Sequence, residues 1–357
     1  METSEQAPNY TKKRGVPMTI KDLAAKTGYA VGTVSRALND HPNVSEKARR
    51  AILQAARESD FQINVNAKQL KQLHSNSILV VVKGIGNELF GEMVEAIQRL
   101  IAETRYQLVV DYMDEDLNEV ARAVQLCREK KPLGILFLGG TNANFLQDFA
   151  AIDVPCVVVT NDASSLPFPN LSSVSTDDAE AARCAVETLI ALGHRRIAII
   201  GGDCVVSDTS RLRYEGCMRA LAKHGLDFDP EQDFRDVRYS YQDGYQAVQE
   251  LLAAGSQFTA VFAMADVMAI GAIRALREAG KRVPEDVSVM GLDGLPLGSY
   301  LVPQLATVSQ SVEALASRSV EILLDAMENG APSCHETVPF GIEKRESIRD
   351  IRTQGEN

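Results

Sequence analysis

The spacing of apolar residues divides the chain into a short helical part and a long mixed part. From Thr19 to about Ser59, apolar residues recur at helical intervals in short stretches, which predicts three helices. Gly28 separates the first two helices, and the polar turn 39–43 separates the second from the third. Three short helices with a tight glycine turn between the first two are typical of a helix-turn-helix domain.

Polar residues mark where these helices begin. Thr19 followed by Asp22 resembles an N-terminal cap, and a second helix is predicted over about 30–38. Ser45 caps a third helix that runs to about Glu58. Residues 60–77 are polar and are predicted to hold a short helix and a linker.

After Ile78 short β-branched runs alternate with amphipathic stretches. Continuous apolar strands that alternate with helices indicate parallel sheets built from βαβ units. About 280 residues are many for one doubly wound sheet, so we expect two lobes. The predicted strands are 78–82, 107–110, 134–138, 156–159, 196–200, 258–262 and 287–291, and the clearest helices are 92–103, 180–192 and 265–279.

The predicted fold is therefore an all-α helix-turn-helix headpiece followed by an α/β body of two doubly wound, parallel-sheet lobes, as in periplasmic binding proteins. The predicted order is an N-terminal tail (1–17), the headpiece (18–63), a hinge helix with linker (64–77), the body (78–345) and a C-terminal tail (346–357).

Charge is distributed unevenly between these parts. The 357 residues carry a net charge of -11, which seems to argue against nucleic acid as a partner. Residues 1–77, however, carry +5 and residues 78–357 carry −16. A basic module attached to an acidic body indicates contact with nucleic acid or a membrane at one end.

The bulk features exclude several other classes of protein. No apolar run reaches the roughly 18 residues that span a bilayer, and the polar N-terminus lacks the core of a signal peptide. We therefore expect a cytoplasmic protein without a membrane partner. The six cysteines are scattered without a C-x-x-C pair, which favours reduced thiols.

The second predicted helix carries side chains suited to reading DNA. A recognition helix presents its N-terminal residues to base edges in the major groove. Arg36 suits bidentate contacts to guanine and Val31 suits a thymine methyl, while Thr19 and Ser35 suit phosphates. The alternative is a generic helical hairpin with a solvated arginine. The candidate positions on the helix are Val31, Gly32, Thr33, Ser35 and Arg36.

These residues resemble the headpiece and hinge of the LacI/GalR family of bacterial transcription regulators. The matching strings are T-I-K-D-L-A…G…V-G-T-V-S-R-A-L-N at 19–39, V-S-E-K-A-R at 44–49 and N-x-N-A-K-Q-L-K at 64–71. The resemblance extends over about 18–345. It implies a homodimer in which each headpiece reads half of a pseudo-palindromic operator, and it adds Asn43 to the DNA contacts.

The same resemblance gives a role to the hinge. In the family a short helix forms here on the operator, and paired leucines wedge into a minor-groove base step. Leu70 matches that leucine, next to Ala67, Lys68 and Lys71. Such a wedge unstacks a base step and bends the duplex. The alternative is a plain linker with one surface leucine.

In the body, two segments resemble the family's effector-binding motifs. Arg213 in R-L-R-Y-E-G matches an arginine that contacts ligand, and a guanidinium suits sugar hydroxyls or a carboxylate. The alternative is an ion pair on a helix surface. Asp266 matches the aspartate of N-D-x-M-A-x-G-A, although Ala265 replaces the preceding asparagine, so one polar contact to a standard sugar is missing.

Three further residues complete the predicted effector site. Asp293 matches the first acid of G-x-D-D, whose second acid is Gly294 here. Thr160 stands where an Asp-containing turn is usual. Phe90 is the last residue of Asn87-Glu88-Leu89-Phe90, which resembles N-P-F-F, and is placed to stack on a ligand face. An arginine, a carboxylate and an aromatic ring suit a small polyhydroxy compound.

Two competing functions were weighed against this one. For a sugar-acting or dinucleotide-binding enzyme, Gly84 and Gly86 hint at a phosphate loop, but the third glycine of the fingerprint falls on Leu89. No catalytic or metal-binding motif is present, and His194 is interpreted as a helix terminator, so no cofactor is expected. A transport-type solute-binding protein would have a signal peptide and no headpiece. We predict a sequence-specific DNA-binding regulator, a repressor controlled by a sugar-like effector.

Overall fold

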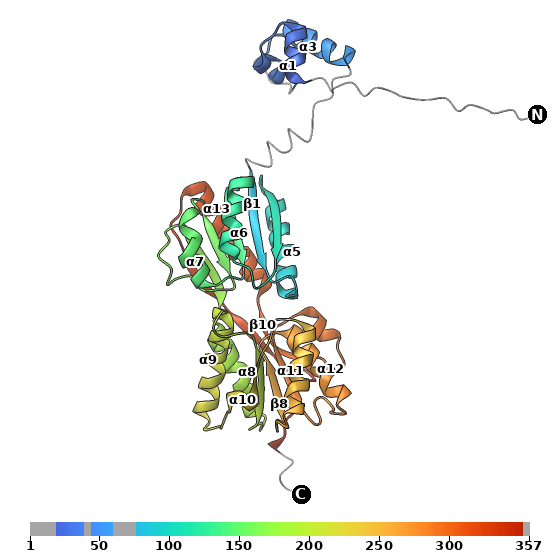
Figure 1. The fold of residues 1–357 in the computed structure, drawn as a ribbon, viewed down its shortest axis with the longest axis vertical. Helices are drawn as coiled ribbons and strands as arrows, with labels where there is room; N and C mark the ends of the chain where they lie inside the picture. The colour runs from blue at the N-terminus through green and yellow to red at the C-terminus, as the bar shows by residue number, and fades with distance from the viewer. Residues whose placement is uncertain (1–18, 39–43, 60–75, 353–357) are drawn as a thin grey trace, which may run out of the picture. The chain divides into compact units, whose positions relative to one another are not determined.

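The computed structural model describes residues 19–38, 44–59 and 76–352, in two compact units that divide between Lys71 and Gln72 (Figure 1). The first unit is the helical headpiece and the second is the α/β body. Each is described by itself below. No helix within the described ranges is long and apolar enough to cross a membrane.

The headpiece contains the three predicted helices, α1 (Ile20–Thr27), α2 (Val31–Leu38) and α3 (Glu46–Glu58). The predicted cap of α1 is confirmed, because the Thr19 hydroxyl accepts from the Asp22 amide and the Asp22 carboxylate accepts from the Thr19 amide. Gly28 ends α1 with φ 70°, a left-handed conformation that glycine adopts without steric cost. The tight turn before α2 follows from that residue.

A small apolar core holds the three helices together. Leu23, Val34 and Ile52, one from each helix, are completely buried, and five smaller buried residues and four partly buried ones pack around them. Because Val34 faces this core, Val31 and Arg36 point away from it: Val31 is 43% exposed and Arg36 is exposed. Within the described part of the headpiece, Val31 and Arg36 are therefore accessible for contact with another molecule.

The first lobe of the body is built on one parallel sheet. Its strand order is β11-β5-β4-β3-β1-β2, so the order reverses beside β1. The strands are β1 (Ser77–Lys83), β2 (Gln107–Met113), β3 (Gly134–Leu138), β4 (Cys156–Val159), β5 (Leu171–Thr176) and β11 (His335–Val338). The helices are α5 (Glu88–Ala102), α6 (Glu119–Lys130), α7 (Asn142–Asp148), η1 (Phe149–Ala151) and α13 (Val312–Asn329).

The second lobe repeats this plan. Its sheet has the order β12-β10-β9-β8-β6-β7, and only β12 runs antiparallel to its neighbour. The strands are β6 (Ile197–Gly201), β7 (Phe234–Asp236), β8 (Ala260–Ala263), β9 (Ser288–Asp293), β10 (Ala306–Gln310) and β12 (Phe340–Glu343). The helices are α8 (Asp178–Ala191), α9 (Asp208–Lys223), α10 (Pro230–Asp233), α11 (Tyr241–Ala253), α12 (Asp266–Glu278) and η2 (Pro296–Tyr300).

The chain crosses between the lobes three times. It leaves the first lobe after β5, returns between β10 and α13, and leaves again between β11 and β12. Two crossings are tied together where the Thr176 hydroxyl donates to the side-chain oxygen of Gln310, at 2.9 Å. Three adjacent crossings form a hinge. The two doubly wound lobes that were predicted can therefore close toward each other about it.

Residues 346–352, predicted as part of a C-terminal tail, instead pack on the second lobe. Ser347 is completely buried, its hydroxyl donates to the carbonyl of Val289 at 2.6 Å, and it accepts from the amide of Ala306 at 2.8 Å. The Val289 amide donates to the carbonyl of Ser347. The segment is held because it satisfies backbone groups of β9 and β10 that would otherwise be buried without partners.

Candidate effector cleft and DNA-reading helix

A cavity of about 750 Å³ lies between the two lobes. Its walls are the carboxyl ends of the parallel strands: Lys83 ends β1, Gly139 and Thr160 follow β3 and β4, and Asp293 ends β9. Ligands of open α/β sheets bind beyond the carboxyl ends of the strands, next to the reversal of strand order. Here two such edges face each other, so a small molecule in the cavity would contact both lobes.

Arg213 is the buried cation of the second-lobe wall. It comes from α9 and is 4% exposed, yet it lines the cavity. Its Nε donates to Oδ1 of Asp178 at 2.7 Å, and its Nη1 donates to the carbonyl of Met264. Asp178 opens α8 and does not line the cavity. The guanidinium is thus fixed from behind while its face is presented to the cleft.

Asp293 stands beside Arg213, with its Oδ1 4.0 Å from Nη1. Gln310 donates to that same Oδ1 at 2.9 Å, whereas Oδ2 is buried and has no hydrogen-bond partner among the described residues. Burial raises the pKa of Asp293 to about 7, and the charge of Arg213 offsets only part of that rise. A buried oxygen without a partner favours a ligand that donates to it, such as a sugar hydroxyl.

Backbone strain marks the same two edges of the cleft. Asp293 has φ 133° and Thr160 has φ 79°, and both line the cavity. Of the described residues other than glycine, only Lys131 shares a positive φ with them. Such conformations cost on the order of 1–3 kcal/mol and persist where the surroundings impose them, often at binding sites.

Phe90 is placed on the first-lobe wall. It belongs to α5, is 7% exposed and lines the cavity. Its ring packs on Gly139, where an added Cβ would lie 3.2 Å from the ring. Gly139 also has φ 76°, so both its conformation and the ring exclude a side chain there. The resulting apolar surface is suited to the face of a sugar ring.

Asp266 is not on the cavity wall, unlike the other predicted effector residues. It is completely buried, and its Oδ1 accepts from the Thr307 hydroxyl at 2.7 Å. Its Oδ2 accepts from the amides of Gly294 and Leu295, at 2.9 and 2.7 Å. Asp266 therefore holds the loop that follows Asp293, and its effect on a ligand is indirect.

In the headpiece, the candidate DNA-reading residues lie on one side of α2. Val31, Gly32 and Arg36 are exposed, and Thr33 and Ser35 are half-buried. The Arg36 Nε donates to the carbonyl of Gly32 at 3.1 Å, so the side chain lies along its own helix. A hydrogen bond of that kind is easily exchanged for one to a base edge.

Other predicted DNA contacts are placed differently or lie outside the described residues. The Thr19 hydroxyl is exposed but donates to the Asp22 carboxylate at 2.6 Å, so a phosphate contact there would compete with the helix cap. Asn43, Ala67, Lys68, Leu70 and Lys71 fall outside the described residues.

Sequence comparisons identify the family. Residues 19–64 match the bacterial regulatory proteins of the lacI family, and residues 186–348 match the periplasmic binding protein-like domain. The HTH-type transcriptional regulator MalR of Clostridium butyricum is 34% identical over 339 residues, covering 94% of this chain and 100% of that relative. The chain belongs to the LacI family.

Solved structures of LacI-family proteins have the same architecture. The lac repressor dimer bound to operator and the anti-inducer ONPF matches with a TM-score of 0.73 and 28% identity, over 94% of this chain and 100% of that one. The complex of the transcriptional regulator CelR with cellobiose matches with a TM-score of 0.68 and 27% identity, over 92% and 99%. Because its relatives are transcription regulators, this LacI-family chain is a DNA-binding regulator and not an enzyme.

The prediction of the cleft from sequence missed several residues that line it. Tyr239, Gln310, Asn161 and Lys83 all contribute to the wall. Tyr239 is half-buried, and its hydroxyl hydrogen-bonds to Ser210 at 2.9 Å. One signal was available: Lys83 directly follows a predicted apolar strand, at the end where ligands of parallel sheets bind.

Contacts between the lobes surround the mouth of the cleft. Arg238 from the second lobe donates to Asp114 and to Glu115 of the first lobe, at 2.6 Å each, and lies 3.5 Å from Asp116. The amide of Asn142, at the start of α7, donates to Asp208 at 2.8 Å. These contacts join the two lobes around the opening of the cleft.

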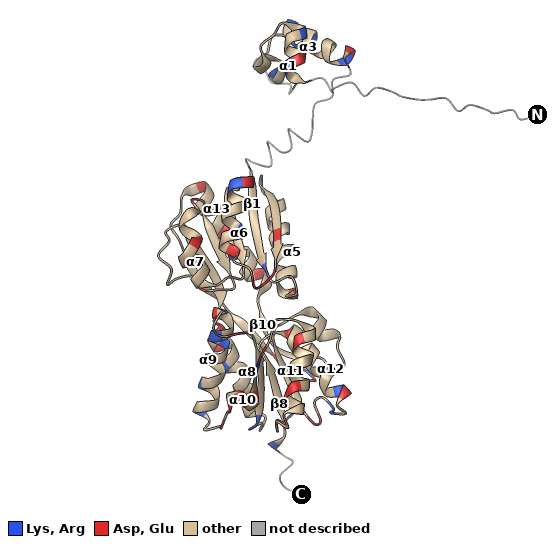
Figure 2. Ribbon diagram, in the orientation of Figure 1, with Lys and Arg blue, Asp and Glu red and all other residues tan. Residues whose placement is uncertain are grey.

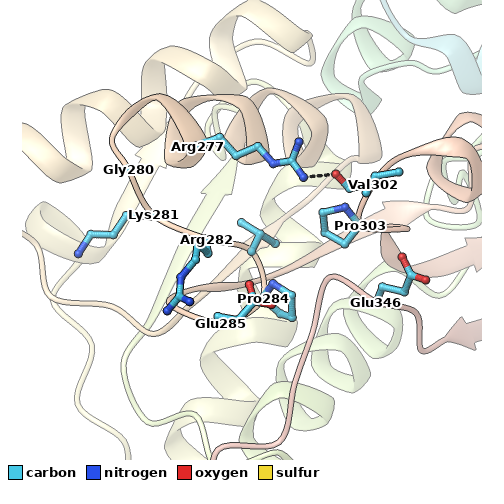
Figure 3. A pocket seen from close by; sticks show the side chains of 10 residues that line it. Arg277, Gly280, Lys281, Arg282, Pro284, Glu285, Val302, Pro303 and Glu346 are labelled. Atoms are coloured by element: carbon cyan, nitrogen blue, oxygen red, sulfur yellow. Dashed lines mark hydrogen bonds between the residues drawn. The ribbon is translucent and has the colours of Figure 1, made fainter.

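His194 and a second hollow lie outside the cleft. His194 is buried at the end of α8 and hydrogen-bonds to Thr259, in agreement with its interpretation as a terminator of the helix. A second hollow, of about 660 Å³, lies on the second lobe around Arg277, Pro284 and Pro303 (Figure 3). Its Arg277 donates to the carbonyl of Val302, and none of the predicted site residues lines it.

Proposed function

We propose that this regulator is a repressor whose affinity for its operator is controlled by a polyhydroxy small molecule bound between the lobes of the body. One observation carries the proposal: the buried Arg213 and Asp293 face a cavity of about 750 Å³, and Asp293 keeps one oxygen without a partner. A guanidinium and a carboxylate side by side suit the vicinal hydroxyls of a sugar. The cellobiose complex of the regulator CelR supports this class of effector.

The DNA-binding part acts through α2 and the hinge. Arg36 and Val31 read base edges in the major groove, while Gly32 permits close approach. Leu70, together with Ala67, wedges into the minor groove, and Lys68 and Lys71 contact phosphates. The operator complex of the lac repressor supports this assignment.

The effector acts by shifting the equilibrium between open and closed lobes. A ligand that contacts both walls favours closure, and it can shift the equilibrium only by its different affinities for the two states. In the dimer, closure changes how the first lobes of the two copies approach each other. That approach orders or releases the paired hinge helices on the operator.

Exposed apolar side chains support a homodimer. Tyr300 and Val302 are 82% and 78% exposed, and Leu297 in the same segment is 41% exposed. Large apolar side chains gathered on one surface of a globular body are typical of an interaction site. The lac repressor structure is a dimer, and a dimer provides the two headpieces that a pseudo-palindromic operator needs. We place this activity in the cytoplasm, where the DNA is.

The proposal is tested by measuring operator binding and effector binding on the same full-length variants. Thermal-shift screening against sugars, nucleosides and purines finds the effector, since a ligand of the folded state raises its melting temperature. The hit should change the affinity for the operator in a fluorescence-anisotropy titration. Arg213→Lys and Asp293→Asn should bind operator normally but lose the response. A normal response in both variants would show that the effector binds elsewhere.

A further inference from the structure

Lys83 forms an ion pair inside the first-lobe wall of the cleft. Its Nζ lies 2.6 Å from Oε2 of Glu119, and the two side chains are 12% and 0% exposed. The ammonium also donates to the Thr141 hydroxyl at 3.3 Å. An ion pair removed from water stabilises a fold little more than apolar residues of the same volume would. Stability alone therefore does not explain why this pair is present.

The partner carboxylate is fully used and lies behind the lysine. Oε1 of Glu119 accepts from the Thr141 amide at 2.7 Å, and Oε2 accepts from the Asn144 side chain at 2.9 Å as well as from Lys83. Lys83, Thr141 and Asn144 line the cavity, but Glu119 does not. Glu119 therefore fixes the ammonium in place without facing the ligand.

An ammonium has three N–H donors, and the described residues engage two of those on Lys83. The third is available to a ligand, because Lys83 is part of the cavity wall. The opposite wall has the same layering, since Arg213 faces the cavity and Asp178 lies behind it. Each lobe thus presents a cation to the cavity and holds it with a carboxylate that does not line the cavity, although on the second lobe Asp293 also lies beside Arg213 on the wall.

The carboxylates that do line the cleft lie away from Lys83. Glu115 and Asp116 are engaged by Arg238 at the mouth, and Asp203 accepts from the amides of its own loop. Asp236 and Asp293 belong to the second lobe. Among the described carboxylates, only Glu119 is within ion-pair distance of Lys83.

We propose that the effector is an acidic polyhydroxy compound, whose anionic carboxylate or phosphate oxygen accepts from Lys83 while its hydroxyls meet Arg213 and Asp293. The inference rests on the proposed function, because it concerns the ligand of the same cleft. An anionic oxygen and the Lys83 ammonium attract each other as opposite charges in a site largely removed from water, whereas a neutral hydroxyl offers only a hydrogen bond, so Lys83 discriminates acids from neutral sugars.

The test uses calorimetric titration of the full-length protein with matched pairs of compounds. The pairs are galactose with galacturonate, glucose with gluconate, glucose with glucose 6-phosphate, and ribose with ribose 5-phosphate. One acid should bind at least about tenfold more tightly than its neutral counterpart, which corresponds to about 1.4 kcal/mol. Whether that acid is a carboxylate or a phosphate identifies the anionic group.

Variants separate the roles of the two walls. Lys83→Met should abolish the preference for the acid, so that the acid and its neutral counterpart bind with similar affinity. Because that change leaves Glu119 buried without its counter-ion, the double variant Lys83→Met/Glu119→Gln removes both charges and should give the same loss of preference in a folded protein. Lys131→Met, which removes an exposed lysine at the end of α6, should keep the wild-type preference.

Three outcomes would overturn the inference. They are a neutral sugar that binds as tightly as its acid, equal losses for both members of a pair in the double variant, and no binding by any acid of the panel. Arg213→Lys should weaken both members of the pair. If it leaves both unaffected, the cleft itself is the wrong site, and the proposed function fails rather than the role of Lys83.

Discussion

Asp293 combines three properties that are rarely found together in one aspartate. It is 2% exposed, it ends β9 with φ 133°, and one of its oxygens has no hydrogen-bond partner. Asp266 reinforces the strained conformation by accepting from the amides of the next two residues. The second lobe thus bears a local cost in stability to keep one carboxyl group at the cleft.

This cost should depend on pH. The pKa of Asp293 is about 7 in the folded protein and near 3.9 in an unfolded chain. The folded state therefore binds more protons between these values, so the contribution of Asp293 to stability is full below pH 4 and is lost as pH rises to 7. Asp293→Asn has no such titration. Its unfolding free energy should therefore rise relative to that of wild type by about 1 kcal/mol for each pH unit between pH 5 and 7.

Urea unfolding at several pH values measures this gain. Asp286→Asn is the matched control, because Asp286 is held ionised by Arg282, which lowers its pKa, and nothing titrates there in this range. A curve for Asp293→Asn that stays parallel to that of wild type would show that Asp293 is ionised throughout.

Arg36 should contribute to specificity more than to general affinity for DNA. If it makes bidentate contacts to a guanine, Arg36→Ala should weaken operator binding by about 1–3 kcal/mol, with a much smaller effect on unrelated DNA. Arg57→Ala removes the same charge from the last turn of α3 and should affect both DNAs alike. Anisotropy titrations with operator and scrambled duplexes measure the difference, and equal losses for Arg36→Ala would rule out base reading.

Single residues differed in how far the sequence could place them. Arg213, Asp293, Thr160 and Phe90 line the cavity at positions that the family resemblance indicated. Asp266 belongs to the same motif but supports a loop, since its carboxylate is used up by backbone amides and a threonine. No local pattern distinguishes an aspartate that faces a ligand from one that caps a loop beneath it.

At the scale of elements, the helices α8 and α9 approach each other unusually closely. Gly216 on α9 faces Ala179 on α8, and a Cβ added to Gly216 would lie 2.0 Å from the Ala179 carbonyl oxygen. That contact is with backbone, which cannot rotate out of the way as a side chain can. The packing places Arg213, one turn before Gly216, against Asp178 at the start of α8.

Two glycine-to-alanine substitutions should therefore have opposite effects on stability. Gly216→Ala forces the helices apart and should lower the unfolding free energy by about 1–3 kcal/mol. Gly91→Ala lies inside α5, where nothing is within 4 Å of the added Cβ, and should raise it by about 0.5–1 kcal/mol. Thermal melts of both variants provide the check, and a Gly216→Ala protein as stable as wild type would contradict the close approach.

Strands with apolar cores were predictable and strands rich in serine were not. The apolar runs correctly predicted β1, β3, β4 and four other strands. The strand β5 was not among the predicted strands, because Ser172, Ser173 and Ser175 leave it without a continuous apolar run. In the structure their positions are buried, and the Ser172 hydroxyl accepts from the Cys334 amide while that of Ser173 accepts from the Ala163 amide. Tertiary partners compensated for the low strand propensity.

For the whole molecule, the segment around η2 should control assembly. Tyr300→Asp and Val302→Asp each put a charge into the surface that we propose as the contact with a second copy. Each variant should therefore shift the equilibrium from dimer to monomer and weaken operator binding. Leu146→Asp is the control, since Leu146 is 60% exposed on α7 of the other lobe. Sedimentation velocity measures the change, and unchanged dimers in both variants would move the interface elsewhere.

Charge at this scale reverses the first impression of an acidic protein. Acidic positions are spread over the helices of both lobes (Figure 2). The basic excess belongs to residues 1–77 of the sequence. The body should repel a duplex and limit nonspecific binding, so DNA contact is left to the headpiece and hinge. The net charge of the whole chain does not show this division, whereas the separate charges of residues 1–77 and 78–357 do.

The three crossings between the lobes also bear on the order in which the chain is made. The strands β1 to β5 are synthesised first, but α13 and β11, which complete their sheet, begin at Val312 and His335. At 5–20 residues per second, the first lobe waits roughly 10–30 s for its last strand. During that interval the edge of β5 and the apolar surface that α13 will cover stay open, a window in which chaperones would act.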